Sequence, residues 1–380
     1  MTRTMRTCFW ALCLSAMILL SCRNDSGDPS VVDIDSFSEK SNASFFEEVY
    51  SDIRLLPLDL DDHLLGSSHQ LYVDKAGDGY VITDMQTEAI LLIGADGSLK
   101  TYVSKVGRGP GEYNYLQTCK YRDHKMIALA DDSHVIEYTE DGELSAEYTL
   151  DYAFADLMLS DNGGAVMLMS RGDGEEEVCD RIIFTDDSYR QTSSFFPLGF
   201  QLFNFGSHLT KLSEDEYFYV PLSMPQVFKC RGNEVVTTYN FDFRGKGFPE
   251  AFLKSDDWEV IYDVMMSTPE IYYVGGAFET PDFLLFCLGS IIDGDDKDYG
   301  LWLIDRRDMS SKIEYFDRNG SEYGFFGPPQ MLTPDNEVVY VCDVSLFDDV
   351  KDTVPGLSRF SSLFEDCPSD YALLFCRIGK

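Results

Sequence analysis

The residues of this sequence with the clearest potential for chemistry lie in one glycine-rich stretch. Three glycines and a proline fall within five positions of the run Val106-Gly107-Arg108-Gly109-Pro110-Gly111-Glu112-Tyr113. Such loops bring backbone N–H groups close to phosphates, and a guanidinium adds a bidentate anion contact. The spacing is not Gly-x-Gly-x-x-Gly, however, and neither a Lys-Ser/Thr pair nor a helix start follows. The stretch therefore predicts a shaped connection between strands rather than a phosphate site.

Each position in this loop has an expected role. The glycines supply unusual backbone angles and the proline fixes one, which makes the structural positions Gly107, Gly109, Pro110 and Gly111. We expect Arg108 to pair locally with Glu112 and Tyr113 to pack beneath the loop. The alternative is that Arg108, Glu112 and Tyr113 contact a ligand at the axial end of the molecule.

Metal chemistry has little support in the sequence. Among the histidines His63, His69, His124, His134 and His208, no two have the spacing of metal ligands on a helix. The run Asp293-Gly294-Asp295-Asp296-Lys297-Asp298 resembles a calcium loop, but it has Lys at its fifth place and Ile304 where a bidentate Glu is needed. We expect a solvated hairpin tip there, with no metal and no cofactor; calcium remains the one alternative.

Composition and motifs exclude several classes of function. The sequence contains no Gly-x-Ser-x-Gly elbow and no His-Glu-x-x-His motif. Its 66 acidic residues against 30 Lys and Arg leave a net charge of −36. Nucleic-acid binding needs a basic footprint, so it is excluded as a partner. A diffuse acidic surface favours solubility and is not in itself a site.

The first residues predict export and lipidation. Arg3 and Arg6 precede an apolar run from Phe9 to Leu20, which is the layout of a signal peptide and is short for a membrane span. Leu19-Leu20-Ser21-Cys22 resembles a bacterial lipobox, so residues 1–21 are expected to be removed and Cys22 to be acylated. The alternatives are an ordinary secretory signal with a chance cysteine and a retained membrane anchor.

The lipobox also predicts a cellular location. Several acyl chains on Cys22 give firm attachment, because each buried methylene contributes about 0.8 kcal/mol. Residues 22–44 begin with a polar run rich in helix and strand breakers, and we expect a flexible tether. The acids in that run, Asp25 and Asp28, are only a weak signal for the cell surface, so a periplasmic and a surface-facing outer-membrane lipoprotein both remain open.

Seven cysteines remain after Cys22, and they are widely spaced. They are Cys119, Cys179, Cys230, Cys287, Cys342, Cys367 and Cys376. There is no Cys-x-x-Cys, so neither a zinc site nor a dense disulfide framework is predicted. Most are expected to pack as small apolar groups, and one pair such as Cys367 and Cys376 is a candidate disulfide.

The elements that must position these residues are repeated strand packets. Strands are predicted at 79–84, 89–93 and 99–103, with an Asp-Gly hairpin at Asp96-Gly97, and again at 125–131, 134–138 and 144–150, with a turn at Asp141-Gly142. The two turns are 45 residues apart, which is a period typical of propeller blades. Four rougher packets follow, and together the six predict an all-β fold with blades arranged around an axis.

Three segments do not follow this repeated pattern of strands. Residues 45–60 predict an opening strand that Pro57 ends. Residues 248–266 are the one stretch expected to form a helix or turn, inserted between the fourth and fifth packets. Residues 343–368 are acidic and loop-rich, and we expect them to decorate the sixth packet.

The order of three motifs resembles a known family. Leu55-Leu56-Pro57-Leu58-Asp59, Leu64-Leu65-Gly66 and the loop Gly107–Tyr113 resemble the six-bladed β-propeller lipoproteins of Bacteroides-type bacteria, which are similar in shape to NHL-repeat propellers. Asp59 stands where that family usually has Glu. The resemblance implies six four-stranded antiparallel blades over residues 45–380 and an acyl anchor, and it implies no particular chemistry.

Three functions are open from the sequence. The first is a non-enzymatic binding or scaffold module tethered to the membrane, with an unknown protein or glycan ligand at one face of the propeller. The second is a propeller hydrolase or lyase with a metal at the axis. The third is a glycan-binding accessory of a nutrient-uptake system, suggested by the aromatic content of 14% and the expected address.

Overall fold

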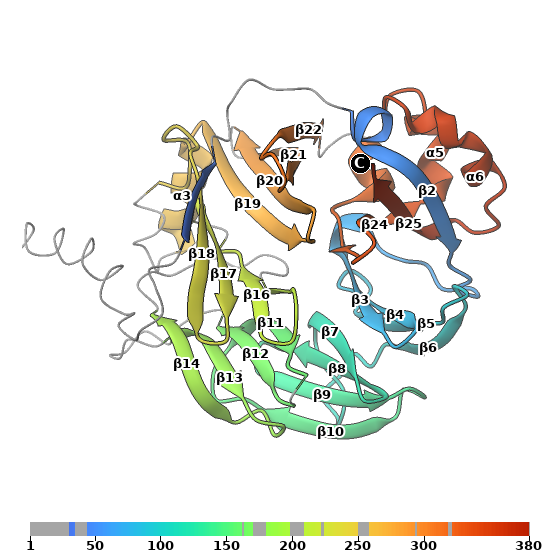
Figure 1. Ribbon diagram of the computed structural model, residues 1–380. Coiled ribbons are helices and arrows are strands. Elements are labelled where there is room, and N and C mark those ends of the chain that lie inside the picture. Colours follow the sequence, from blue (N-terminus) through green and yellow to red (C-terminus); the bar gives the residue numbers. More distant parts are fainter. Residues whose placement is uncertain are drawn as a thin grey trace, which may run out of the picture.

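The protein forms six β-sheets arranged in a ring (Figure 1). Each sheet has four antiparallel strands, and one sheet carries a fifth strand, so the expected six-bladed propeller is confirmed. The computed structural model describes residues 30–34, 44–161, 163–169, 180–197, 209–221, 224–249, 258–292, 295–317 and 321–379. The predicted signal peptide and Cys22 lie outside the described residues.

The first three blades follow one another along the chain. Blade one consists of β3 (Leu71–Ala76), β4 (Gly79–Asp84), β5 (Ala89–Ile93) and β6 (Leu99–Val103). Blade two consists of β7 (Leu116–Arg122), β8 (Lys125–Ala130), β9 (His134–Thr139) and β10 (Leu144–Thr149). Blade three consists of β11 (Phe154–Leu159), β12 (Ala165–Met169), β13 (Asp180–Thr185) and β14 (Gln191–Pro197). In each blade the first strand is the innermost.

The last three blades include both early strands of the chain. Blade four consists of β15 (Leu209–Lys211), β16 (Glu216–Tyr219), β17 (Gln226–Arg231), β18 (Glu234–Phe241) and β1 (Ser30–Ile34). Blade five consists of β19 (Glu270–Glu279), β20 (Phe283–Ile292), β21 (Asp295–Asp305) and β22 (Ser311–Asp317). Blade six consists of β23 (Met331–Leu332), β24 (Glu337–Asp343), β25 (Tyr371–Ile378) and β2 (Tyr50–Pro57).

Strand β2 closes the ring. It pairs antiparallel with β25 from Tyr50 opposite Ile378 to Pro57 opposite Ala372, so blade six is built from both ends of the propeller. The sequence predicted a strand from residue 45, but Phe45–Val49 forms a π-helical turn, η1, that buries Phe45, Phe46 and Val49 before the strand begins. This pairing covers the edge of β25 and gives blade six its fourth strand, contributed by the other end of the propeller.

Part of the predicted tether is a strand. Ser30–Ile34 pairs parallel to β18 as the fifth strand of blade four, whereas residues 22–44 were expected to be a flexible tether. The prediction was wrong for these five residues because Ile34 is apolar and packs with Phe241 and Phe243. The run is too short to be distinguished from its polar flanks in the sequence.

The core lies between neighbouring blades rather than inside one sheet. In β4, Val81 packs with Ala128 and Ile136 of blade two, and the next residue, Ile82, packs with Val339 of blade six. Both faces of the strand are therefore buried, which explains its nearly continuous apolar sequence. The predicted Asp-Gly hairpins join β5 to β6 and β9 to β10, and Gly97 and Gly142 have positive φ angles of 84° and 77°.

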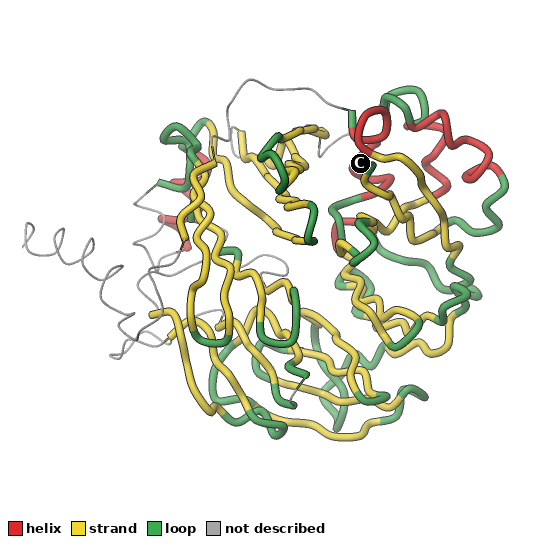
Figure 2. The backbone as a smooth tube through the Cα atoms, in the orientation of Figure 1, coloured by secondary structure: helices red, strands yellow, loops and turns green. Residues whose placement is uncertain are grey.

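The helices are short and lie beside the ring of strands (Figure 2). Helix α3 (Trp258–Ser267) lies between blades four and five, within the stretch expected to be helical. The segment between β24 and β25 is more helical than expected. It contains η3 (Val344–Leu346), α5 (Phe347–Val350), η4 (Leu357–Phe360) and α6 (Ser361–Glu365). Two further short helices are η2 (Ser68–Gln70) and α4 (Ser321–Phe326).

The insertion in blade six is held by aromatic packing. Phe347 of α5 and Phe364 of α6 are stacked, with ring centroids 4.3 Å apart. Both rings also contact Phe325 of α4. Across the described residues, every helix is too short or too polar to span a bilayer.

Candidate functional site

Charged side chains lie close together on three neighbouring inner strands. The inner strands β3, β7, β11, β15, β19 and β23 contact one another in that order, and Gln330, just before β23, accepts a hydrogen bond from Val73 N of β3. They carry Asp74 on β3, Lys120 on β7 and Asp156 on β11. No motif in the sequence marks any of these three residues.

Lys120 and Asp74 form an ion pair, and Asp156 is hydrogen bonded to backbone N–H groups. Lys120 Nζ lies 2.8 Å from Asp74 Oδ2, and the lysine side chain is largely buried. Asp156 is fully buried and accepts hydrogen bonds from Leu157 N and Leu209 N, each at 2.8 Å. Burial by itself lowers the pKa of Lys120, but the carboxylates of Asp74 and Asp156 outweigh it and raise that pKa. Lys120 is therefore a cation between two carboxylates.

This pairing limits the chemistry of the inner strands. A protonated lysine is neither a base nor a nucleophile. It also pairs with Asp74, a carboxylate that a metal ion bound at these strands would need. Within the described ranges, no three His, Cys, Asp or Glu side chains are close enough together to hold a metal.

A second group of polar residues lies where blades one, two and three are connected. The loop between β8 and β9, residues 131–133, is hydrogen bonded to two connections at once. Asp131 Oδ1 accepts hydrogen bonds from Asn114 N at 3.0 Å and Tyr115 N at 3.1 Å, in the connection between β6 and β7. On its other side, Phe154 N donates to Asp132 O at 2.7 Å and Leu150 N to Ser133 O at 2.7 Å. The three segments therefore form one cross-linked frame.

Two tyrosines stand exposed on this frame. Tyr115 is 40% exposed and Tyr152 is 41% exposed, and they belong to the two connections that are hydrogen bonded to loop 131–133. Partial burial, together with a hydrogen bond to the Asp132 carboxylate, raises the pKa of Tyr115, so its hydroxyl stays protonated. We call Tyr115, Tyr152 and Asp132 the tyrosine surface. Large exposed rings on a hydrogen-bonded support are characteristic of binding sites.

The glycine-rich loop connects β6 of blade one to β7 of blade two. Gly109 N donates to Glu112 Oε2 at 2.7 Å, while Gly111 N donates to Glu147 of β10 at 3.0 Å. Glu112 thus bonds the loop backbone, and no ion pair joins it to Arg108. The contact with Glu147 holds the loop against an outer strand of blade two.

The side chains that this loop contributes differ in exposure. Tyr113 is fully buried and donates from its hydroxyl to Glu88 O at 2.9 Å. Arg108 and Glu112 are exposed. A ligand-binding role for Arg108 and Glu112 stays a prediction, whereas the contacts of Tyr113 are those of a packing residue.

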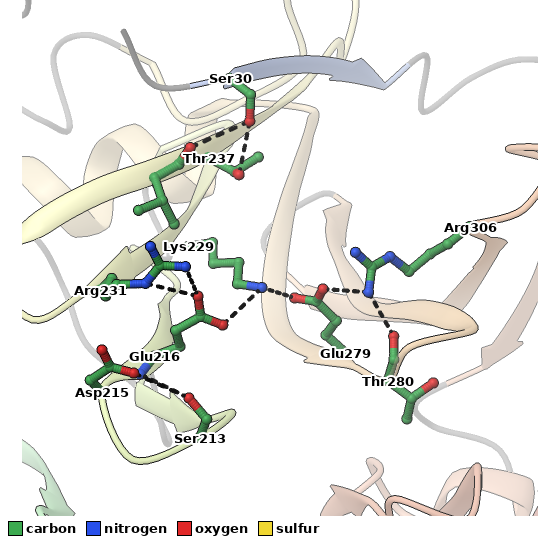
Figure 3. Close-up of polar contacts among 11 residues, drawn as sticks. Ser30, Ser213, Asp215, Glu216, Lys229, Arg231, Thr237, Glu279, Thr280 and Arg306 are labelled. Carbon is green, nitrogen blue, oxygen red and sulfur yellow. Dashed lines mark hydrogen bonds and ion pairs between the residues drawn. The ribbon is translucent and has the colours of Figure 1, made fainter. Parts of the chain in front are cut away.

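An ion-pair network joins blades four and five (Figure 3). Glu279, at the end of β19, lies 2.9 Å from Lys229 Nζ of β17 and 2.6 Å from Arg306 Nη1. Lys229 also pairs with Glu216 of β16 at 3.2 Å, and Arg231 pairs with Glu216 as well. Burial by itself raises the pKa of Glu216, but Arg231 and Lys229 outweigh it and lower that pKa. Every charge in the network has a partner, so we assign it to holding the two blades together.

The histidines are not brought together. His63 stacks on Tyr102 with ring centroids 3.8 Å apart, and His124 lies 3.2 Å from Glu140. His134 lies 3.8 Å from Asp131, His69 lies in η2, and His208 is outside the described residues. In the run that resembles a calcium loop, Asp295–Asp298 belong to strand β21, while residues 293 and 294 are outside the described residues.

The described cysteines are all free. The candidate disulfide between Cys367 and Cys376 is therefore not formed. Cys376 is buried in the core beside β24, whereas Cys367 follows α6 and its thiol donates to Ser369 O at 3.4 Å. Burial raises the pKa of Cys376, so it stays a thiol. Cys179 lies outside the described residues.

Comparison with known proteins assigns the family. The sequence matches the family described as Domain of unknown function (DUF4934) over residues 29–366. The chain belongs to the DUF4934 family. No curated protein matches its sequence.

Solved structures support the fold of this DUF4934 protein. A protein of Bacteroides fragilis, described as a candidate exported protein, is similar with a TM-score of 0.71 at 16% identity, over 92% of this chain and 100% of that one. A member of the DUF4221 family from Bacteroides vulgatus is similar with a TM-score of 0.52 at 9% identity, over 88% and 98% of the two chains. At these identities the similarity concerns the fold.

Proposed function

We propose that this DUF4934 protein is an extracytoplasmic binding module, tethered to a membrane through Cys22, and that the tyrosine surface holds its ligand. The observation that carries the proposal is that Tyr115 and Tyr152 are both exposed and belong to two connections that are hydrogen bonded to one loop. A tyrosine ring offers a large amphipathic contact and loses little conformational entropy on binding. The hydrogen bonds beneath the rings fix the frame in advance, which lowers the cost of binding.

Two observations support the proposed location outside the cytoplasm. Leu19-Leu20-Ser21-Cys22 has the pattern of a lipobox. The similar protein from Bacteroides fragilis is described as a candidate exported protein. Both favour a location outside the cytoplasm, in the outer membrane, without choosing the periplasmic or the cell-surface side.

The ligand class we favour is a glycan. The C–H face of a sugar ring packs on an exposed aromatic ring, and the Asp132 carboxylate beside Tyr115 accepts hydrogen bonds from hydroxyl groups. Among the functions open from the sequence, this favours the glycan-binding accessory of a nutrient-uptake system. The alternative of a metal-dependent hydrolase or lyase is disfavoured by Lys120, whose ammonium group already pairs with Asp74 and interacts with Asp156.

A glycan array tests this function. The mature protein is compared with the Tyr115→Ala/Tyr152→Ala double variant and with Met309→Ala, which removes an exposed apolar side chain in blade five. Loss of two central aromatic contacts is expected to cost about 2 kcal/mol or more, a roughly thirtyfold drop in affinity. Met309→Ala should bind as the wild type does.

The melting temperatures decide how a loss is interpreted. Surface substitutions change stability by about 0.5 kcal/mol or less, so all three proteins should melt alike. Glycan binding that survives the double variant, or the absence of binding to any glycan on the array, would count against this assignment.

A further inference from the structure

The position of β1 fixes where the tether leaves the fold. Ser30 Oγ hydrogen bonds to Thr237 Oγ1 at 2.9 Å, Asp33 Oδ1 accepts from Asn240 Nδ2 at 3.0 Å, and Asp242 N donates to Ile34 O at 2.9 Å. Together with the parallel pairing to β18, these bonds attach residues 30–34 to the outer edge of blade four. Figure 3 shows Ser30 on β1 reaching Thr237.

The remaining tether is short. Seven residues lie between Cys22 and Ser30, which makes eight residue-to-residue steps, and an extended chain spans at most about 3.5 Å per step, so the tether reaches about 28 Å. A domain of this length has a radius of gyration of about 20 Å and hence a diameter of about 50 Å. The anchor therefore holds the blade-four edge, and not the opposite side of the ring, near the bilayer.

Exposed apolar side chains gather at the same edge. Among the described residues, eleven large apolar side chains are exposed, and four of them belong to β1 and α3: Val31, Val260, Tyr262 and Met266. Val31 is 60% exposed and Tyr262 is 50% exposed. Tyr272, which follows α3, donates from its backbone N to Lys246 O at 2.7 Å, and this links the segment after α3 to the segment that follows β18. Ile34 of β1 and Tyr272, five residues after α3, belong to one cluster with Phe243.

We propose that the protein rests edge-on against the bilayer that holds its acyl chains, with β1 and α3 as the contact. This rests on the proposed anchoring through Cys22. The contact is made by apolar and not by basic side chains, because α3 has no Lys or Arg, and its Glu259 and Asp263 provide no attraction to the bilayer. Four side chains would be a weak membrane site alone, but the anchor makes their contact intramolecular and so supplies a high effective concentration. The ring axis then lies along the membrane surface, and both ends of the propeller stay open to ligands.

The test is fluorescence of the acylated protein in phosphatidylcholine vesicles. An environment-sensitive probe is attached at Val31→Cys or Met266→Cys, in a background where Cys179 and Cys367 are replaced by Ser. The control positions are Leu64→Cys and Met309→Cys. Leu64 is 74% exposed, in the connection between β2 and β3 across the ring from blade four.

We expect probes at 31 and 266 to shift to the blue on incorporation and to lose intensity with brominated lipid, while the control probes do not change. Equal quenching at all four positions would overturn the edge-on contact. So would unquenched probes at 31 and 266 on protein that floats with the vesicles, which leaves the anchor intact. If the wild-type protein floats no better than Cys22→Ala, the anchor itself fails and the contact fails with it.

Discussion

Glu314 is a buried carboxylate that connects the start of the propeller to blade five. It lies on β22, and its Oε2 accepts a hydrogen bond from Phe45 N, the first residue of η1, at 2.6 Å. Burial raises the pKa of Glu314 to about 7, and the nearby carboxylates of Glu322 and Glu48 add to this, although the bond from Phe45 acts in the opposite direction. The folded protein therefore holds this proton more tightly than the unfolded chain.

This raised pKa predicts a loss of stability as pH rises. The proton is bound in both states below about pH 4.5, and the folded state alone keeps it up to about pH 7, so stability falls across that window. Glu314→Gln keeps an acceptor for Phe45 N and removes the titration. Relative to this variant, the wild type should lose on the order of 3 kcal/mol of unfolding free energy between pH 4.5 and 8. Urea unfolding of both proteins measures it, and parallel pH profiles would contradict the assignment.

At the scale of elements, the outer strands of the early blades were predictable and the inner strands were not. β4, β5 and β6 begin and end at the residues expected from the sequence, because continuous apolar runs and an Asp-Gly turn mark them. None of the six inner strands was predicted. β15 and β23 have only three and two residues, and β3 and β7 carry Asp74 and Lys120, whose charges interrupt the apolar pattern.

The candidate site was not predictable from the sequence either. Tyr115 and Tyr152 are 37 positions apart in the sequence, in connections without a recognisable motif. The two connections that carry these tyrosines are linked through their hydrogen bonds to loop 131–133, and these bonds form only when the blades are assembled. The glycine-rich loop, in contrast, was predicted as a connection between blades from its glycines and proline and from the strands predicted on either side of it.

The hairpin at Gly97 gives a prediction at this scale. A Cβ at Gly97 would lie 2.0 Å from the carbonyl oxygen of Pro57, and its φ is +84°. Gly97→Ala should therefore lower the unfolding free energy by about 3 kcal/mol or more, because backbone strain and a clash with backbone add together.

Gly77→Ala is the matched control for that change. Gly77 also has a positive φ, of +58°, but nothing lies within 4 Å of its added Cβ. It should cost only the strain of the left-handed conformation, about 1–2 kcal/mol. Equal midpoints for the two variants in urea would show that the contact with Pro57 does not matter.

For the whole molecule, β1 and β2 have different tasks. β2 closes the ring on β25, while β1 adds a fifth strand to a blade that is already complete. A chain that starts at residue 44 should thus melt cooperatively within a few degrees of the mature protein. A chain that starts at residue 58 lacks η1 and β2, which exposes the edge of β25 and the core around Phe45 and Ile53, and it should aggregate or lose its cooperative transition. Differential scanning calorimetry distinguishes them, and a cooperative transition in the shorter chain would show that the ring does not need its closure.

The closure also sets the order of events as the chain is made. Tyr50 is synthesised among the first residues of the propeller, and its partner Ile378 is almost the last. Five blades can form from local hairpins as the chain emerges, but blade six must wait for the C-terminus while η1 and β2 stay unpaired. Contacts this distant in sequence form slowly. If acylation occurs before translocation ends, the ring closes only after its N-terminal end is already fixed to the membrane, so the last folding step takes place at the bilayer surface.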